Sequence, residues 1–359
     1  MKSILTFING LAAWAIVLSC NGQGGKNEHT LDSFISNKAD SLYKSQNLPG
    51  IFIGVLNDGK RQYYNYGFAD PDKKISFDSA TLFEIGSITK TFTAFIVEKV
   101  LAGKGISDSI SILEYLPDSV KMNKALEKIS FLNLLNHTSG LPRLPDNIDL
   151  STRQPYENYD LNKLFAFLKT TKPKPPGTYE YSNLGFGLAG VLSSLINKKS
   201  YAALLDEHVF FPLNMLKPDD SIEAIDKKSK GFMENEAVDY WKFDALAGAG
   251  ALTCNSAEML SWFQFVSQSM SISRNKIIDK LLEPTVTLSA STKVCRAWHT
   301  LEEKEKPVIY WHNGGTYGFS TFGAFIKGEN KAVIVVINQF NKNAVSDGLG
   351  MEIMKKLNQ

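Results

Sequence analysis

The sequence predicts an α/β chain of the α+β type. An antiparallel sheet, built from both chain ends and flanked by helices, carries an inserted, mostly helical lobe. Two β-like runs near the N-terminus, Ile51–Leu56 and Gln62–Phe68, are separated by the hairpin signal Asn57-Asp58-Gly59. The β-like runs near the C-terminus are Val308–Trp311, Phe319–Ile326 and Ala332–Asn338. Helical patterns dominate the sequence between the two ends, so the simplest arrangement pairs both ends in one sheet.

Helices are expected at both ends of this domain and throughout its middle. The apolar residues that recur at helical spacing in the first helix are Leu31, Phe34, Ile35, Leu42 and Tyr43. The other helical segments are 88–101, 130–136, 160–169, 184–197, 200–211, 256–268 and 344–356. We expect a single domain over 31–359, with a sheet lobe at 31–86 and 296–359. The helical lobe is expected at 87–295, with ligands in the seam between the lobes.

The N-terminus has the pattern of an export signal over residues 1–20. An apolar stretch, Ile4–Leu18, follows a short positive end and is too short to predict a membrane span. Cys20 at the expected cleavage point resembles a bacterial lipoprotein box, in which the thiol is acylated. Residues 21–30 would then be a flexible linker. We expect a lipid-anchored periplasmic or cell-envelope protein, while Leu18 is unusual in such a box and leaves plain secretion open.

The composition excludes several classes of function. The chain has 39 basic and 37 acidic residues, a net charge of +2, and no clustered basic face of the kind that binds nucleic acid. Cys254 and Cys295 could pair in an oxidising compartment, although two buried thiols are the simpler expectation. Neither cysteine has a partner at zinc-ligand spacing, so we expect no metal and no cofactor.

Ser87 and Lys90 are the first candidates for chemistry. Residues three apart on a helix share a face, so the Lys90 amine can reach the Ser87 hydroxyl. A serine needs such a base to become a nucleophile, and a partly desolvated lysine can be one. The alternative is a serine that caps the helix and an exposed lysine, which explains most isolated Ser-x-x-Lys sequences.

Two further segments could complete the site. In Tyr181-Ser182-Asn183, a neighbouring cationic lysine would make the tyrosine phenol more acidic, whereas Ser182 or Asn183 could simply cap a helix. In His312-Asn313-Gly314-Gly315, the glycines allow close approach of a backbone N–H to a ligand, whereas the alternative is a strand-ending turn with a structural histidine. Gly185–Gly190 matches a dinucleotide-binding glycine pattern without the required strand, so packing of small residues explains it better.

Taken together, these motifs resemble the serine β-lactamase and penicillin-binding superfamily, most closely its class C-like branch. The segments that carry this resemblance are Tyr66–Asp70, Thr81–Lys90, Leu134–Pro142, Pro176-Gly177, Tyr181-Ser182-Asn183, Ala247–Gly250 and His312–Gly315. The resemblance implies a β-lactamase/transpeptidase-like fold and an acyl-enzyme on Ser87, with Lys90 and Tyr181 sharing the proton. It also implies that Asn183 hydrogen-bonds the substrate amide or steadies Lys90. The N–H groups of Ser87 and Gly315 would hold the oxyanion.

One departure from that family narrows the expected substrate. β-Lactamases carry Lys-Thr-Gly where this chain has His312-Asn313-Gly314, and a histidine is largely neutral at pH 7. Losing one charge-assisted contact costs about 1.5–3 kcal/mol. We therefore expect a small ester, a D-amino-acid peptide or a peptidoglycan-derived fragment as substrate, and weak or absent β-lactamase activity. The alternatives are a D,D-carboxypeptidase or β-lactamase, and a non-catalytic binding lipoprotein with the same fold.

Overall fold

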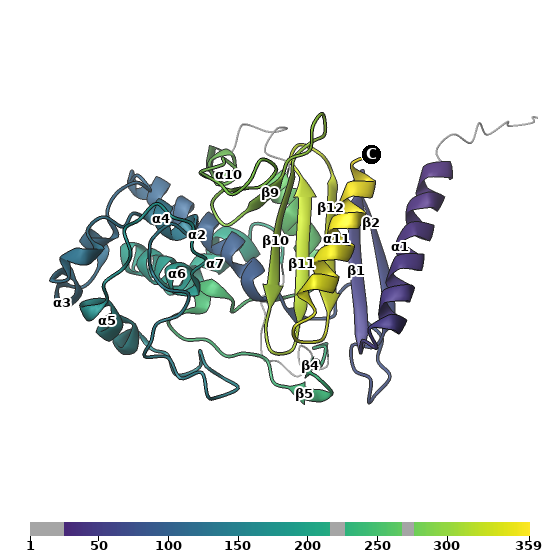
Figure 1. Ribbon diagram of the computed structural model, residues 1–359, viewed down its shortest axis with the longest axis horizontal. Helices are drawn as coiled ribbons and strands as arrows, with labels where there is room; N and C mark the ends of the chain where they lie inside the picture. Colours follow the sequence, from purple (N-terminus) through teal and green to yellow (C-terminus); the bar gives the residue numbers. More distant parts are fainter. Residues whose placement is uncertain (1–24, 216–226, 268–275) are drawn as a thin grey trace, which may run out of the picture.

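The computed structural model describes residues 25–215, 227–267 and 276–359. Eight strands form one antiparallel sheet in the order β2-β1-β12-β11-β10-β9-β8-β7 (Figure 1). Their bounds are β1 Gly50–Asn57, β2 Lys60–Gly67, β7 Val286–Thr287, β8 Lys293–Val294, β9 His299–Leu301, β10 Ile309–Gly315, β11 Ser320–Ile326 and β12 Lys331–Ile337. The first hairpin pairs with the last strand, with Ile51 opposite Ile337. The predicted fold class is therefore confirmed.

Alternating side chains of β1 fill two separate hydrophobic cores. Ile53 and Val55 pack into a core with α1 and α11, whereas Phe52 and Leu56 belong to the core on the opposite face. The helices that cover the sheet are α1 Gly25–Ser45 and α11 Asn343–Leu357 on one face and α9 Ser256–Ser267 on the other (Figure 1). A Cβ built on Gly54 would lie 3.4 Å from Leu260 of α9, so this helix lies directly against the strand.

The remaining helices form the lobe beside the sheet. They are α2 Thr89–Lys104, α3 Asp118–Lys121, α4 Phe131–Leu135, α5 Leu161–Thr170, α6 Asn183–Asn197, α7 Tyr201–Leu205 and α10 Lys276–Leu281, with a π turn at Asp206–Phe210. The 3-10 turns are Gly86–Ile88, Ile112–Tyr115, Lys124–Leu126 and Ala247–Ala249, and the short strands are β3 Phe83–Glu84, β4 Gly231–Met233, β5 Glu236–Val238 and β6 Thr253–Cys254. A Cβ on Gly187 of α6 would lie 2.4 Å from the Leu246 side chain, which confirms that packing explains the glycine pattern there.

The structure corrects several expected boundaries. Helix α1 begins at Gly25, so residues 25–30 belong to it, and the rest of the expected linker and the 1–20 signal lie outside the described residues. Helix α9 was assigned to the helical lobe but covers the sheet, because its apolar side packs on β1. Strands β7 and β8 extend the sheet to residues before 296.

The described residues contain no membrane-crossing helix and no metal-binding group of side chains. Within these residues, no helix has the length and apolar character that crossing a membrane requires. The same residues contain no group of His, Cys, Asp and Glu side chains placed to hold a metal ion. Cys254 and Cys295 are buried and unpaired, so the expectation of two buried thiols is confirmed over a disulfide.

Candidate active site

Ser87 lies in the 3-10 turn Gly86–Ile88, between strand β3 and helix α2. Gly86 has a φ of +51°, and a Cβ there would lie 2.7 Å from the nitrogen of Gly315. Glycine is therefore required at this close approach. The N-cap of α2 is Ile88 and carries no side-chain capping bond, so the alternative that Ser87 caps the helix is wrong.

Lys90 on the first turn of α2 is fully buried beside this serine. Its amine donates hydrogen bonds to Ser87 Oγ at 3.0 Å and to the carbonyl oxygen of Ala249 at 2.6 Å. Burial lowers the pKa of Lys90 well below its usual range, and the positive charge of Arg143 lowers it further. A neutral amine can accept the Ser87 proton while it still donates to Ala249. The alternative of an exposed lysine is wrong.

Tyr181 lies on the other side of the nucleophile. Its hydroxyl hydrogen-bonds Ser87, and the Lys90 amine lies 5.0 Å from the ring centre. Burial raises the pKa of Tyr181 above its usual value, although the hydrogen bond from Ser87 and the charge of Arg143 act in the opposite direction. The expected acidification by lysine is wrong, because the buried Lys90 is itself driven toward its neutral form. Burial therefore favours the protonated phenol at Tyr181 and the neutral amine at Lys90.

Asn183 is the first residue of α6, and Ser182 caps that helix. Ser182 Oγ accepts the N–H of Gly185 at 2.9 Å and donates to the carbonyl oxygen of Pro142 at 2.7 Å, so the capping interpretation holds for this serine. The Asn183 side chain donates to the Tyr156 hydroxyl at 3.2 Å. Its Oδ1 is buried and has no partner among the described residues, which leaves it available to a substrate N–H.

The last residues of β10, Gly314 and Gly315, lie against the segment that precedes Ser87. A Cβ on Gly314 would lie 2.0 Å from the carbonyl oxygen of Ile85, so only glycine fits there. Asn343 of α11 donates to the Gly314 carbonyl oxygen at 2.7 Å. Because the C=O and N–H of a trans peptide point in opposite directions, the Gly315 N–H is directed away from α11. Gly315 lines the same cavity as Ser87.

His312 is fully buried inside strand β10, and it does not line the cavity that contains Ser87. His312 therefore lies within the strand and not in the strand-ending turn of the alternative, 6.4 Å from Tyr181 between ring centres, and its expected substrate contact stays a prediction. Burial lowers the pKa of His312 well below its usual value, and neighbouring His299 and Lys90 add to the effect. Because its pKa is lowered, the His312 ring is neutral at pH 7, in line with the expectation of a largely uncharged histidine.

Sequence analysis missed the role of His137 within the segment Leu134–Pro142. Its ring stacks on Tyr181 with 4.2 Å between ring centres, and its Nδ1 accepts the N–H of Ser182 at 3.0 Å. The backbone φ of +61° at His137 turns the chain so that the imidazole faces the tyrosine. His137 therefore positions the Tyr181 loop. The available signal was the position of this histidine inside Leu134–Pro142, one of the segments that carry the family resemblance.

The cavity beside Ser87 has a volume of about 300 Å³ and an aromatic wall. Tyr156 and Phe243 stack with 4.5 Å between ring centres, and Trp241 contacts Tyr317 edge-on at 4.8 Å. These aromatic residues, like Arg143 at the cavity edge, were not predicted, because loops that are distant in sequence bring them together. A cavity that combines aromatic walls with polar groups suits a small organic or peptide ligand.

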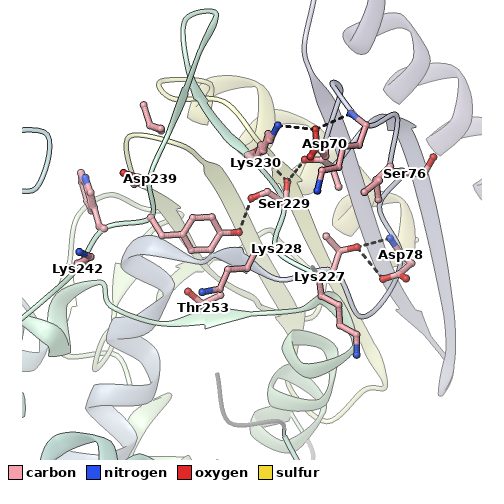
Figure 2. A pocket seen from close by; sticks show the side chains of 17 residues that line it. Asp70, Ser76, Asp78, Lys227, Lys228, Ser229, Lys230, Asp239, Lys242 and Thr253 are labelled. Carbon is pink, nitrogen blue, oxygen red and sulfur yellow. Dashed lines mark hydrogen bonds and ion pairs between the residues drawn. The ribbon is translucent and has the colours of Figure 1, made fainter. Parts of the chain in front are cut away.

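A larger cavity, of about 870 Å³, lies outside this site and has a different character. Figure 2 shows its charged lining, which includes Lys227, Lys230 and Asp70. Lys230 forms an ion pair with Asp70 at 3.1 Å, so part of the charge is already neutralised. Ser87 does not line this cavity, and Trp241 lines both. The chemistry of a nucleophile and its base assigns the active site to the smaller cavity.

Comparisons with known proteins agree with this geometry. A family model described as Beta-lactamase matches residues 31–356. A beta-lactamase from Escherichia coli (strain K12) is 27% identical over 82% of this chain and 74% of its own length. One from Pseudomonas fluorescens is 32% identical over 50% of this chain and 48% of its own length. The crystal structure of a beta-lactamase/D-alanine carboxypeptidase from Pseudomonas syringae matches with a TM-score of 0.78 at 21% identity, and covers 91% of this chain and 99% of that one.

Proposed function

Because this chain belongs to the beta-lactamase family, we propose that it is an exported serine hydrolase that cleaves an ester or amide through an acyl-enzyme on Ser87. The observation that carries the proposal is the hydrogen bond of 3.0 Å between Lys90 Nζ and Ser87 Oγ, with the lysine completely buried. Burial removes the usual obstacle to a lysine base, which is its positive charge at neutral pH. The buried Lys90–Ser87 pair supports Ser87 as the nucleophile, and membership of the family supports a serine hydrolase.

The reaction follows from the contacts of these groups. Ser87 Oγ attacks the substrate carbonyl while neutral Lys90 accepts its proton, and the N–H groups of Ser87 and Gly315 stabilise the oxyanion. The protonated Tyr181 hydroxyl then donates a proton to the leaving oxygen or nitrogen, and the proton that Lys90 took from Ser87 passes from Lys90 to Tyr181. Water attacks the acyl-enzyme in the second half of the cycle and releases the acid. Asn183 Oδ1 accepts a substrate N–H during both steps.

The proposed substrate is a small ester, a D-amino-acid peptide or a peptidoglycan-derived fragment, rather than a β-lactam. His312 and Asn313 stand where β-lactamases carry lysine and threonine, and the neutral His312 ring lies outside the cavity. A permanent cation is therefore missing at that position. The relatives named beta-lactamase keep a D,D-carboxypeptidase or β-lactamase activity as the second candidate.

We propose export and lipid anchoring from the N-terminal pattern alone. Cys20 would be acylated after cleavage of residues 1–20, which places the enzyme in the periplasm or cell envelope of a bacterium. Metabolic labelling with an alkyne fatty acid would test this, because Cys20→Ser should abolish the label and release the protein from the membrane fraction. Labelling that survives Cys20→Ser contradicts the anchor.

Intact-mass measurement after treatment with a fluorophosphonate tests the acyl-enzyme proposal. The wild type and the Ser109→Ala control, which alters an exposed serine, should gain one adduct, whereas Ser87→Ala should gain none. A parallel treatment with penicillin separates the two enzyme candidates. An adduct with fluorophosphonate alone favours an esterase or peptidase, whereas rapid penicillin acylation favours the second candidate. If no adduct depends on Ser87, the chain is a non-catalytic binding protein.

A further inference from the structure

The cavity beside Ser87 contains one formal charge. Arg143 lines it, and no other charged side chain does so among the residues that the structure describes. A cavity with aromatic walls, one cation and no carboxylate attracts an anion, because the low-dielectric walls strengthen the field of the single guanidinium. The charge of the cavity therefore differs from that of the larger, lysine-lined one, where carboxylates partly neutralise the lysines.

The backbone at Arg143 is fixed, while its guanidinium is exposed. The Arg143 carbonyl oxygen accepts the N–H groups of Asn183 at 3.0 Å and Leu184 at 3.2 Å, which anchors the residue at the start of α6. The guanidinium carbon lies 5.0 Å from the centre of the Tyr181 ring, so the side chain extends over the catalytic tyrosine.

The guanidinium has no carboxylate partner in the described part of the chain. Arg153 and Arg296 differ in this respect, because each forms an ion pair at 2.8 Å, with Glu236 and Asp108 respectively. An arginine with five N–H donors and no carboxylate partner among the described residues is suited to a planar anion of a ligand.

The lining of the cavity restricts the rest of the ligand. The stacked Tyr156 and Phe243 rings give an apolar wall, and the unpartnered Asn183 Oδ1 can accept one N–H. His312 supplies no competing cation, because its ring is buried outside the cavity. An ester or amide with a free carboxylate and an adjacent apolar group complements these three features.

From this arrangement we infer that Arg143 is the specificity-determining residue of the site and binds the carboxylate of an anionic ester or amide substrate. The guanidinium forms two parallel N–H···O bonds with the carboxylate, as planar recognition requires. The apolar group of the same substrate lies against the aromatic wall. The inference rests on the proposed hydrolase function and names the substrate class of that site.

Two pairs of esters test the inference on the full-length protein. In the first pair, para-nitrophenyl hydrogen glutarate carries the carboxylate on the acyl side and para-nitrophenyl methyl glutarate is its neutral match. In the second, meta-carboxyphenyl acetate carries it on the leaving group and meta-carbamoylphenyl acetate is neutral. Each is assayed with the wild type, Arg143→Gln, Arg143→Lys and the control Arg153→Gln. The rates are compared within each pair at the pH plateau, so that any effect of Arg143 on Lys90 cancels.

The expected result is a loss confined to a charged ester. In Arg143→Gln, kcat/KM for the charged member of at least one pair falls about ten- to a hundredfold more than for its neutral match, mainly through KM. Arg143→Lys recovers part of the loss, and Arg153→Gln resembles the wild type. Equal losses within both pairs, or no preference of the wild type for either charged ester, would overturn the inference.

Failure of the hydrolase proposal gives a different result. The wild type would then hydrolyse none of the four esters and would form no fluorophosphonate adduct on Ser87. Correct folding of the Arg143 variants is checked by their fluorophosphonate adduct, because that neutral reagent needs the nucleophile and not the carboxylate contact. Hydrolysis of the neutral esters together with an unchanged charge preference in Arg143→Gln therefore addresses Arg143 alone.

Discussion

Helix α2 buries two ionisable side chains, and the two differ in what faces them. Glu98 lies against Arg296 at 3.2 Å and Lys280 at 2.8 Å, and Arg296 in turn pairs with Asp108 at 2.8 Å. Lys90, two turns earlier, faces a hydroxyl, a carbonyl oxygen and an aromatic ring, with no carboxylate among its described contacts.

The difference separates a structural charge from a reactive one. At Glu98 the opposite charges of Lys280 and Arg296 offset part of the cost of burial, although burial still raises the pKa of the carboxyl. The ion pairs join α2 to α10 and to the chain after it. At Lys90 nothing offsets that cost, and the group responds by losing affinity for its proton. A buried lysine without a carboxylate is therefore a functional signal, whereas a buried paired glutamate is a packing feature.

Replacement of the reactive charge should have the largest effect on activity. Lys90→Met keeps the volume and removes the base, so kcat/KM for a neutral ester should fall about a thousandfold or more. The fold should be no less stable, because an uncompensated buried amine is removed. Initial rates and thermal unfolding of the same preparation measure both quantities. Activity within tenfold of the wild type would contradict the role of Lys90.

Replacement of the structural charge should have the opposite outcome. Glu98→Ala leaves Arg296 buried without one of its partners and should cost about 3–5 kcal/mol of unfolding free energy. The kcat/KM of the folded fraction should stay unchanged. Glu283→Ala is the matched control, because this exposed residue lies 3.7 Å from the same arginine and should cost about 0–1 kcal/mol. Similar losses in both variants would show that the cluster is not structural.

The pH dependence of activity and of unfolding free energy depends on the buried Lys90 amine. Activity should rise with pH through the lowered pKa of Lys90, since the neutral amine is the base. Between that pKa and the usual lysine value near 10.4, the unfolded chain binds a proton that the folded chain does not. Unfolding free energy should therefore rise with pH in this window, by at most about 1.4 kcal/mol per unit. Denaturant titrations at several pH values measure this contribution.

Two variants control the interpretation of that pH profile. Lys90→Met should lose the part of the stability slope that comes from the amine. Arg143→Gln should move the rising limb of kcat/KM to higher pH, because Arg143 lowers the pKa of Lys90. An unmoved limb would assign the limb to another group.

The substitution with the smallest expected effect on activity is His312→Lys, which introduces the lysine that β-lactamases carry at this position. His312→Lys places a cation in a fully buried position, where burial disfavours the charged form. We expect a loss of stability of about 1–3 kcal/mol and no gain in penicillin acylation, because the position does not line the cavity. Burst kinetics with a chromogenic cephalosporin check this. A marked gain in acylation would mean that the side chain at 312 reaches the substrate.

Local patterns were sufficient to predict the sheet and most helices. The Asn57-Asp58-Gly59 turn predicted the hairpin of β1 and β2, because these residues accept the positive φ that Asp58 and Gly59 adopt. The layer to which α9 belongs could not be predicted. Its apolar residues fit any core, and the choice of the sheet depends on Gly54 leaving room for Leu260.

The candidate site likewise combines residues that local spacing predicts with features that depend on tertiary packing. Ser87 lies in the 3-10 turn that runs directly into α2, and Lys90 lies three residues later on α2, so spacing alone brought them together. The pKa shift of Tyr181 was predicted with the wrong sign. Burial raises this pKa, and the extent of burial is a tertiary property. Arg143 and the wall formed by Tyr156 and Phe243 were missed, since no local pattern shows which loops meet. The residues that line the cavity beyond the reacting groups were therefore the hardest to predict.

The contact of Gly86 with Gly315 has a consequence for the synthesis of the enzyme. The nucleophile comes from the first third of the chain, whereas its neighbour Gly315 comes from a strand made near the end. That strand is held by β11, which itself needs β12 between it and the N-terminal hairpin. An incomplete chain therefore cannot assemble the reactive centre. Under the proposed function, reactivity of Ser87 is thus a test of complete folding, and a chain that is still being made is inert.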